Sequence, residues 1–228
     1  MNITIQEQTF ERLRRMIIKT ELTPGQKISE ARLTEMLNVG RTPVRESLKQ
    51  LKKQGLVYTI PQSGTYVSKI DMEQAVNARF VRECVEKEVM TELSAKLTKS
   101  SEETLANILR KQKLAFAEND IAKYYDLDND FHRTCYAAVG KFQVWDWINQ
   151  FNIHLDRFRW LHLKVETFDF NTIAKEHEDL FEAVRARDTV EVKYLTVRHI
   201  HFMLRSQKRI IAEFPDYFTD ESNATVKK

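Results

Sequence analysis

The sequence predicts a mainly α-helical protein with a small N-terminal domain over residues 1–70 and a larger antiparallel helical bundle over residues 71–214. The chain of 228 residues contains only five Gly and four Pro, so helix breakers are rare. Apolar residues recur at helical spacing through most of the chain, and β-type runs occur only at 57–60 and 65–67. The remaining residues, 215–228, are expected to form a polar tail.

The small domain is predicted to begin with a helix within residues 8–19. Three apolar residues share one face of this helix: Phe10, Leu13 and Ile17. The turn sequence Leu22-Thr23-Pro24-Gly25 ends it, because Pro and Gly together favour a reverse turn. The next element should therefore start a few residues later.

Two further short helices are predicted from their end signals. Ser29 is a good N-cap for the second helix. Thr42 is expected to cap the third, with Pro43 at its first position, where a missing N–H costs nothing, and Gly55 ends it. The apolar faces of the two helices are formed by Leu33, Leu37, Val44, Leu48 and Leu51.

A β-hairpin is predicted after the third helix, since the runs 57–60 and 65–67 flank the turn Pro61-Gln62-Ser63-Gly64. Helix, turn, helix and hairpin within about 60 residues is typical of a winged helix-turn-helix. Residues 1–70 also carry twelve Lys or Arg against six Asp or Glu, although the whole chain has a net charge of only +3. A basic small domain suggests a polyanionic partner.

The start of the third helix is the predicted DNA-reading surface. Arg41 and Arg45 point away from its buried face, and the N-terminal end of a recognition helix is the part that reaches base edges. An arginine there can donate two hydrogen bonds to guanine, and the hydroxyl of Thr42 can bind a phosphate. Spacing alone leaves one alternative open, a solvated basic helix within a bundle.

The second domain contains no convincing strand. Its apolar spacing predicts six helices, near residues 72–97, 102–118, 120–138, 142–165, 170–186 and 188–212. Short breaks between them favour antiparallel neighbours. No segment approaches the roughly 18 apolar residues that a membrane span needs, and the N-terminus lacks an apolar leader, so we expect a cytoplasmic protein.

Four residues of this domain are candidate metal ligands. Asp128 and His132 are spaced i, i+4 and so share a helix face. His177 and His199 lie at equal distances from the break near Asp188, which places them at the same height in an antiparallel helical hairpin. Three imidazoles and a carboxylate suit a transition metal, but three ordinary core histidines, with Asp128 bonding His132, remain the alternative.

Two other charged positions complete the expected arrangement. His201 is turned away from His199 by its position and is expected at the surface. Arg82 shares a face with apolar residues, so its charge should point into the bundle and needs an anionic partner. Glu86, at i+4, is one partner, and the carboxylate of a bound ligand is another.

The small domain resembles the GntR superfamily of regulators. Four blocks carry the resemblance: Leu22-Thr23-Pro24-Gly25, Ser29-Glu30-Ala31-Arg32-Leu33, Arg41-Thr42-Pro43-Val44-Arg45-Glu46-Ser47-Leu48 and Gly55-Leu56-Val57. The resemblance implies DNA contacts from Arg32, Arg41, Thr42, Arg45 and the wing tip Ser63-Gly64. Two positions depart from the usual pattern: Asn38 replaces a frequent Gly, and Gly40 replaces a Ser or Thr that often contacts phosphate.

The second domain resembles the FCD ligand-binding domain of the FadR-like branch, and its six predicted helices resemble the VanR-type subgroup. The segments 127–132 and 176–188, followed by His199, carry this resemblance. It implies that Asp128, His132, His177 and His199 bind one transition metal per chain, such as zinc, nickel or manganese. It also implies that Arg82 lies near the effector.

These observations predict a homodimeric DNA-binding transcription regulator, usually a repressor, which binds a pseudo-palindromic double-stranded operator and a small organic acid, with no membrane partner. It is not expected to be an enzyme. Two alternatives remain: a metal-dependent hydrolase, and a regulator whose metal is purely structural. No carboxylate beyond Asp128 is clearly placed as a general base, although Glu176 and Glu178 flank His177. An enzyme would also leave the Arg41–Arg45 motif unexplained.

Overall fold

The computed structural model describes residues 4–165 and 170–224. The chain divides into two compact units. One, here called the mixed unit, contains residues up to Ala75, Ile153–Leu161 and the residues from Gln207 onward. The other, the helical unit, contains Val76–Asn152 and His162–Ser206. Each unit is therefore built from separated stretches of sequence.

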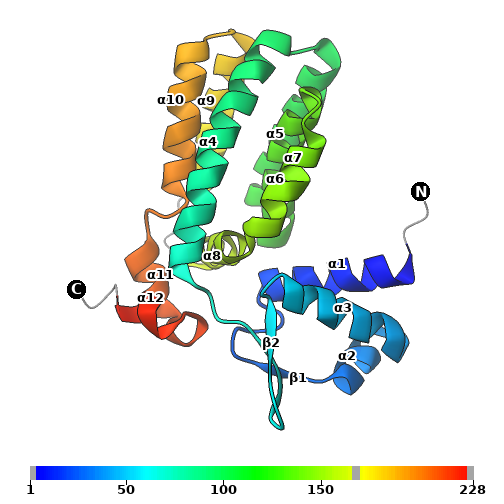
Figure 1. Ribbon diagram of the computed structural model, residues 1–228. Helices are drawn as coiled ribbons and strands as arrows, with labels where there is room; N and C mark the ends of the chain where they lie inside the picture. The colour runs from blue at the N-terminus through cyan, green and yellow to red at the C-terminus, as the bar shows by residue number, and fades with distance from the viewer. Residues whose placement is uncertain (1–3, 166–169, 225–228) are drawn as a thin grey trace. The chain divides into compact units, whose positions relative to one another are not determined.

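The mixed unit contains the winged helix-turn-helix (Figure 1). Its elements are α1 (Ile5–Ile18), β1 (Lys27–Ile28), α2 (Glu30–Leu37), α3 (Arg41–Lys53), β2 (Val57–Ile60) and β3 (Gly64–Val67). The strands form an antiparallel sheet in the order β1-β3-β2. The predicted apolar faces are buried against one another, with Leu13, Leu33, Val44 and Leu51 at most 1% exposed.

The turn between α2 and α3 shows one difference from the prediction. Ser29 caps α2 as expected, by accepting a hydrogen bond from the Arg32 backbone N–H at 3.3 Å. The N-cap of α3, however, is Gly40 and not Thr42. The left-handed residue Asn38 (φ 53°) ends α2 early, so α3 can begin before Thr42, which then lies inside its first turn.

The hairpin is confirmed as the pair β2 and β3, and its tip requires a glycine. Gly64 has φ +140°, and a Cβ at this position would lie 2.7 Å from Lys27 Cε. Lys27 belongs to β1, a two-residue strand that sequence patterning does not predict, and it pairs with Tyr66 of β3. Because Lys27 Cε is near the end of a flexible side chain that can move, the positive φ is what requires glycine here.

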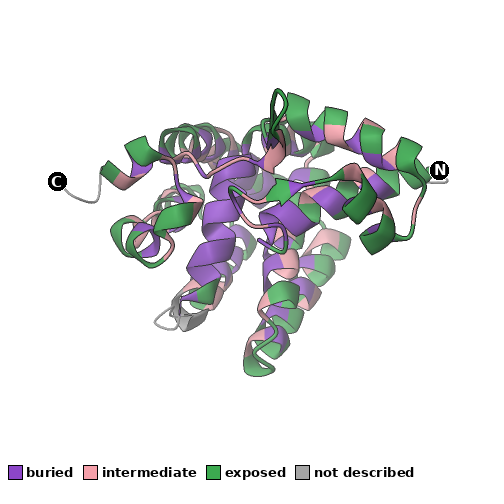
Figure 2. Cartoon of the chain, turned by 90° about the horizontal axis from the view of Figure 1, so that it is seen from below, coloured by how far each residue is buried: buried purple, intermediate pink, exposed green. Residues whose placement is uncertain are grey.

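The helical unit is a bundle in which α5 packs against both α6 and α9, α6 against α7, and α9 against α10 (Figure 1). Its helices are α4 (Met72–Lys96), α5 (Lys99–Ala117), α6 (Ile121–Ala138), α7 (Phe142–Phe151), α9 (Phe170–Arg185) and α10 (Thr189–Phe202). The helices show buried residues on one side and exposed residues on the other (Figure 2). Among the described residues, none of the helices combines the length and the apolar character needed to cross a membrane.

Two of the predicted helices are interrupted. The helix expected over 142–165 breaks at Asn152 into α7 and α8 (Ile153–Lys164). The helix expected over 188–212 breaks after Phe202, and α11 (Gln207–Glu213) follows. Helix α8 is buried from Ile153 to Leu163. A helix that is buried on every side has no polar face to mark its ends in the sequence.

Most of helix α8, Ile153–Leu161, packs inside the mixed unit, although the prediction assigned it to the bundle. The side chain of Ile153 belongs to the same apolar cluster as Leu13 and Val44. Arg157 Nη2 donates to the carbonyl of Ser68 at 2.6 Å. Further bonds join His154 to the backbone of Asp71 (2.9 Å) and Trp160 to Thr20 (3.2 Å).

The segment expected as a polar tail is also packed, as far as the structure describes it. It forms a short 3-10 helix (Pro215–Tyr217) and α12 (Asp220–Ala224). Phe218 is fully buried and bridges to Ile70, and Ser222 accepts a bond from the Met72 backbone N–H at 3.0 Å. Residues 225–228 lie outside the described part.

Candidate functional site

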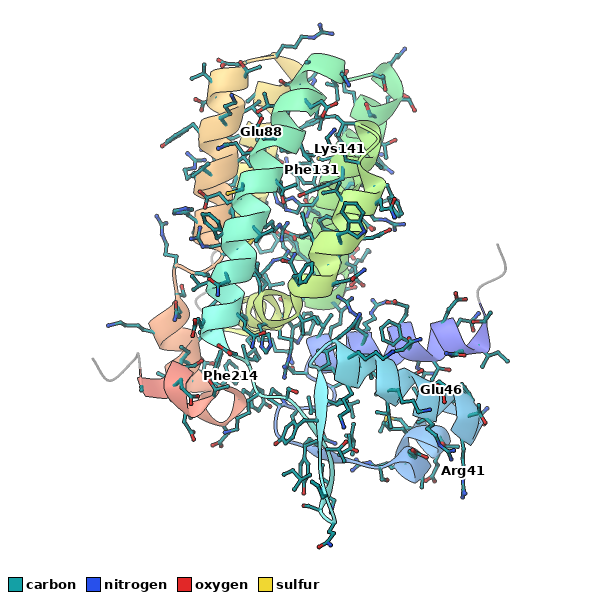
Figure 3. All side chains as sticks on the ribbon, viewed as in Figure 1. Arg41, Glu46, Glu88, Phe131, Lys141 and Phe214 are labelled. Atoms are coloured by element: carbon teal, nitrogen blue, oxygen red, sulfur yellow. The ribbon has the colours of Figure 1, made fainter. Side chains whose placement is uncertain are left out.

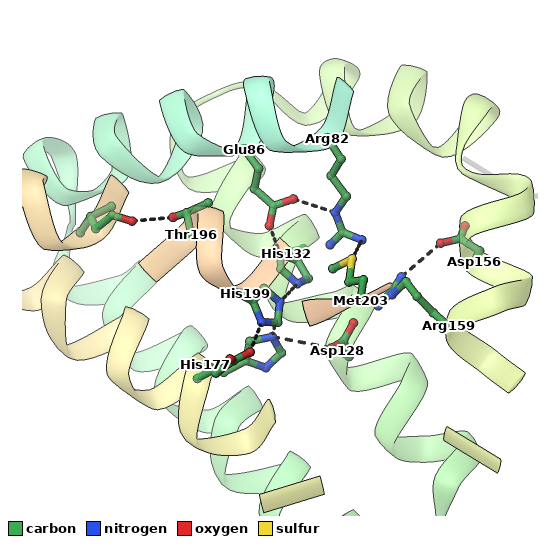
Figure 4. Close-up of polar contacts among 12 residues, drawn as sticks. Arg82, Glu86, Asp128, His132, Asp156, Arg159, His177, Thr196, His199 and Met203 are labelled. Carbon is green, nitrogen blue, oxygen red and sulfur yellow. Dashed lines mark hydrogen bonds and ion pairs between the residues drawn. The ribbon is translucent and has the colours of Figure 1, made fainter. Parts of the chain in front are cut away.

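Three histidines from three helices meet inside the helical unit (Figure 4). His132 lies on α6, His177 on α9 and His199 on α10, and each is at most 3% exposed. Their Nε2 atoms face one another: His199 Nε2 lies 3.2 Å from that of His177 and 3.4 Å from that of His132. The ligand atoms all lie within 4.8 Å of one another. The structure thus brings together the three imidazoles that the sequence singles out.

The hairpin of α9 and α10 explains why His177 meets His199. Asp188 caps α10 at the turn, and the two histidines lie eleven residues to either side of it. They therefore reach the same height, as the sequence predicts. His201 is exposed, with its Nε2 atom 2.7 Å from a carboxylate oxygen of Glu83, and so lies apart from the cluster.

Each histidine of the cluster has an oxygen acceptor at its other ring nitrogen, Nδ1. The three pairs are His132 with Glu86, His177 with Gln112 (3.2 Å) and His199 with Glu176 (3.1 Å). An oxygen acceptor fixes the proton on Nδ1 and leaves the lone pair on Nε2. Three lone pairs directed at one another repel unless a cation lies between them. The acceptors therefore prepare all three Nε2 atoms to ligate a metal.

The electrostatic environment keeps two of these imidazoles, those of His132 and His177, neutral. Burial lowers the pKa of His132 to about 4, against the opposing charge of Glu86. Burial, reinforced by the neighbouring His199, lowers the pKa of His177 well below its usual range. Neutral imidazole is the form that binds metal ions, so no proton needs to be displaced from Nε2.

Asp128 lies beside the cluster, although it is not part of the group whose ligand atoms all lie within 4.8 Å of one another. It lies one turn before His132 on α6, is 6% exposed, and its Oδ1 atom lies 3.6 Å from His177 Nε2. A divalent ion with metal–nitrogen bonds of about 2.1 Å in tetrahedral geometry separates its nitrogen ligands by about 3.4 Å. The Nε2 separations of 3.2 and 3.4 Å are close to that spacing. The donor set and its geometry fit a transition metal.

Arg82 points into the same interior from α4 and is fully buried. Its Nε atom donates to Glu86 at 2.8 Å, which is the i+4 pair expected from the sequence. The outer edge of the guanidinium is different: Nη1 faces the sulfur of Met203 at 3.9 Å, and Nη2 has no partner among the described residues. The guanidinium also lies 5.9 Å from the ring of Trp145. Part of its hydrogen-bonding capacity is therefore unused.

Sequence reasoning did not find the acceptors Gln112 and Glu176. Gln112 is 1% exposed on α5, within a stripe that includes Leu105 and Leu109. A polar residue on an apolar helix face is a usable signal, because it needs a buried partner. Glu176 is adjacent to His177 in sequence, and nothing in the spacing shows that it bonds His199 instead.

The predicted DNA-reading residues lie on the surface of the mixed unit. Arg41 stands at the start of α3 (Figure 3), and Thr42, Arg45 and Arg32 are also exposed. Arg45 Nε lies 3.6 Å from Glu30, a contact between two exposed side chains that costs little to break. At the wing tip, the Ser63 hydroxyl bonds the Tyr66 hydroxyl at 2.6 Å beside Gly64. The positive side chains at the N-terminus of α3 are exposed, so a polyanion can reach them.

A winged helix-turn-helix with exposed arginines, joined to a helical domain, defines a DNA-binding transcription regulator. Comparison with known families agrees with this. Residues 5–67 match the family described as bacterial regulatory proteins, gntR family, and residues 78–202 match the FCD domain. The chain belongs to the gntR family of bacterial regulators and carries an FCD domain.

Similar proteins are named as regulators. The HTH-type transcriptional repressor RspR of Escherichia coli strain K12 is 29% identical over 95% of both chains. An HTH-type transcriptional regulator of Streptomyces ambofaciens is 31% identical and covers 99% of this chain and 94% of its own. The solved structure of E. coli McbR/YncC has a TM-score of 0.81 at 16% identity, covering 93% of this chain and 100% of its own, which shows a shared fold.

Proposed function

We propose that this regulator is a cytoplasmic, homodimeric repressor that binds a pseudo-palindromic operator and responds to a small organic acid at a metal-containing pocket. The convergence of three Nε2 atoms, each on a histidine whose Nδ1 atom is bonded to an oxygen, carries the metal part of the proposal. Repression is proposed because RspR, which aligns over 95% of this chain, is named a repressor.

On DNA, α3 is proposed to enter the major groove with its N-terminal end. Arg41 and Arg45 would each donate to guanine O6 and N7, which discriminates by about 1–3 kcal/mol per base pair. Thr42, Arg32 and the backbone amides at the start of α3 would bind phosphates, and the wing tip Ser63-Gly64 would lie against the backbone. The amide of Gly40 takes the place of the hydroxyl that other family members offer.

In the helical unit, His132, His177, His199 and Asp128 are proposed to hold one zinc, nickel or manganese ion. When bound, the ion supplies positive charge and an open coordination position for an oxygen of the effector. The outer guanidinium edge of Arg82 then binds a second oxygen of the same molecule. The Tyr136 hydroxyl, which is buried and has no partner among the described residues, offers a further donor. These groups favour a dicarboxylate, hydroxy acid or sugar acid.

Dimerisation is proposed through α4 and α7. The two helices are neighbours, because Val85 and Val89 pack with Trp145 and Ile148. Their outer sides expose large apolar residues: Val76, Phe80, Val81, Trp147 and Phe151. A second copy of the chain covers this surface and supplies the second recognition helix that a two-fold operator needs.

The experiment that tests the proposal starts from purified protein. Elemental analysis should find about one transition metal per chain, and mass analysis of released ligand should identify an acid. In a thermal-shift screen, acids should raise the Tm of metal-loaded protein while the corresponding amides do little, and the best acid should release operator DNA. If only neutral or cationic molecules bind, or if chelated protein binds acids equally well, the effector proposal is wrong.

The same purified protein distinguishes the proposed function from two alternatives. A metal-dependent hydrolase would turn over ester, amide or phosphate substrates, which this protein should not do. A purely structural metal predicts that a metal-site variant still responds to the acid. We expect that response to disappear together with the metal.

A further inference from the structure

Arg82 and the histidine cluster share one carboxylate, that of Glu86 (Figure 4). The side chain of Glu86 is 1% exposed. One of its oxygens accepts from Arg82 Nε at 2.8 Å, and the other contacts His132 Nδ1. Each oxygen thus serves one partner. Glu86 is the direct link between a buried guanidinium and a proposed metal ligand.

Both partners of Glu86 use only one side for this link. His132 turns Nδ1 to the carboxylate and Nε2 to His199. Arg82 turns Nε to the carboxylate, whereas its Nη2 atom has no partner among the described residues. The contacts therefore run from Arg82 through Glu86 to His132. The His132 end is suited to a metal ion, and the Arg82 end is suited to an anion.

We propose that Glu86 is a positioning residue that couples the metal site to the anion site: it orients His132 and transmits any change at Arg82 to that histidine. This inference rests on the proposed function, in which a metal binds at the histidines and an acid binds at Arg82. An acid at the outer edge of Arg82 competes with Glu86 for the guanidinium charge. Glu86 then holds the imidazole N–H more strongly, which makes Nε2 a better ligand. By linkage, the metal strengthens acid binding by the same factor.

The same helix provides a matched control pair. Arg79 and Glu83 are also spaced i, i+4, with Arg79 Nη1 bonded to Glu83 at 2.7 Å. Their side chains are 18% and 23% exposed, and the histidine that Glu83 contacts is the surface residue His201. This pair repeats the chemistry of Arg82–Glu86 beside a histidine that lies outside the cluster.

The first test measures the affinity for Zn²⁺ by competition with a chelator. Glu86→Gln keeps the shape of the side chain and removes its charge, and we expect it to weaken Zn²⁺ binding by about 10- to 100-fold. Glu83→Gln should stay within about two-fold of wild type. A Glu86→Gln protein that also stays within this range overturns the proposal.

The second test asks whether Arg82 acts on the metal through Glu86. Arg82→Met should change the Zn²⁺ affinity by at least about five-fold in the wild-type background and by less than about two-fold in the Glu86→Gln background. Arg79→Met should change it by less than about two-fold, with or without Glu83→Gln. An equal effect of Arg82→Met in both Glu86 backgrounds overturns the coupling.

A measurement on the unaltered chain covers the case in which these variants do not fold. In Zn²⁺-loaded protein labelled with ¹⁵N-histidine, the His132 ring should carry its proton on Nδ1, in a strongly hydrogen-bonded, slowly exchanging signal. A proton on Nε2, or a rapidly exchanging Nδ1 proton, overturns the proposal. If wild-type protein binds no metal, both the coupling through Glu86 and the proposed metal site are wrong. Wild-type protein that binds metal, beside an unaffected Glu86→Gln, overturns the coupling alone.

Discussion

The Nε2 atoms of His177 and His199 lie 3.2 Å apart because the two residues stand at equal distances from the turn between α9 and α10. His177→Ala removes one of the proposed ligands, so we expect the purified variant to lose most of its metal. A chelator should lower the Tm of wild-type protein, because the metal binds the native state, and should have little effect on the variant. Elemental analysis and differential scanning calorimetry measure these two outcomes.

The matched control for this prediction is His201→Ala. His201 is near His199 in sequence but is exposed beside Glu83. The His201→Ala variant should keep wild-type metal content and the full response of its Tm to the chelator. Equal metal content in the two alanine variants would show that His177 is not a ligand.

The DNA interface predicts a specific loss of operator binding. Arg41→Ala together with Arg45→Ala should remove two bidentate base contacts and weaken specific binding by about 2–6 kcal/mol, with little effect on the fold. Wild-type affinity should also fall steeply with salt, because several phosphates are neutralised. Fluorescence anisotropy with operator DNA at several salt concentrations measures both effects.

Arg110→Ala is the control for nonspecific loss of charge. Arg110 is an exposed arginine of α5 that bonds Asn107, and its removal should leave operator affinity unchanged. If the Arg41/Arg45 double variant binds the operator as tightly as this control, the recognition-helix assignment is wrong.

Ile153 should contribute to the stability of the mixed unit, although it lies within residues 78–202, which match the FCD domain. It is 3% exposed within the apolar cluster that includes Leu13. Ile153→Ala should cost about 2–4 kcal/mol of unfolding free energy through lost burial and a residual cavity. Urea denaturation measures this loss, and hydrogen exchange should show weaker protection of the amides of α1.

Val190→Ala gives the comparison for Ile153, because Val190 is 78% exposed. Val190→Ala should change the free energy of unfolding by no more than about 0.5 kcal/mol. Unchanged protection of α1 in Ile153→Ala would contradict the placement of α8 in this unit.

His154 predicts a loss of stability in mild acid. Its Nδ1 atom accepts the Asp71 N–H at 2.9 Å, and burial, followed by the charge of Arg157, lowers its pKa to about 4. An unfolded histidine titrates near pH 6.5, so the unfolded state takes up the proton first as the pH falls. The contribution of His154 is complete above about pH 6.5 and is lost between pH 6.5 and 4, by about 1–2 kcal/mol at pH 5.

The test for His154 compares urea unfolding at pH 7.5 and pH 5. His154→Asn keeps an acceptor for the Asp71 N–H but does not titrate, so it should lose less stability on acidification than wild type. Other buried histidines, such as His162, whose pKa burial lowers to about 4, titrate in both proteins and cancel in the comparison. Identical losses in the two proteins would exclude a role for His154.

Local signals account for most of the fold that the sequence predicts. Ser29, Gly55 and the turn of the wing act on their own neighbours in the chain, so their effects can be read from spacing. Strand β1 is only two residues long and exists because it pairs with β3, which is a long-range contact. The break at Asn152 has no Gly or Pro to mark it, and α8 is stabilised by distant residues such as Ser68.

The same distinction applies to the metal centre. The height of His177 and His199 follows from counting residues along a hairpin, and the pair Arg82–Glu86 follows from helical spacing. The contact between Glu86 and His132 joins α4 to α6 and depends on how each helix is rotated about its axis. Apolar spacing defines that rotation too coarsely to choose between Arg82 and His132 as the partner of Glu86, or to reveal that it binds both.

Helix α8 has a consequence for building chimeric regulators. The chain passes between the two units four times, because Ile153–Leu161 and the residues from Gln207 onward return to the mixed unit. A single cut after residue 75 therefore leaves the apolar contacts of Ile153 unfilled and removes the bridge from Phe218 to Ile70, on a fragment that still contains all the strands that the structure describes. An exchange of sensor domains between family members must carry α8 and the C-terminal helices with the DNA-binding part, as one set of co-adapted surfaces.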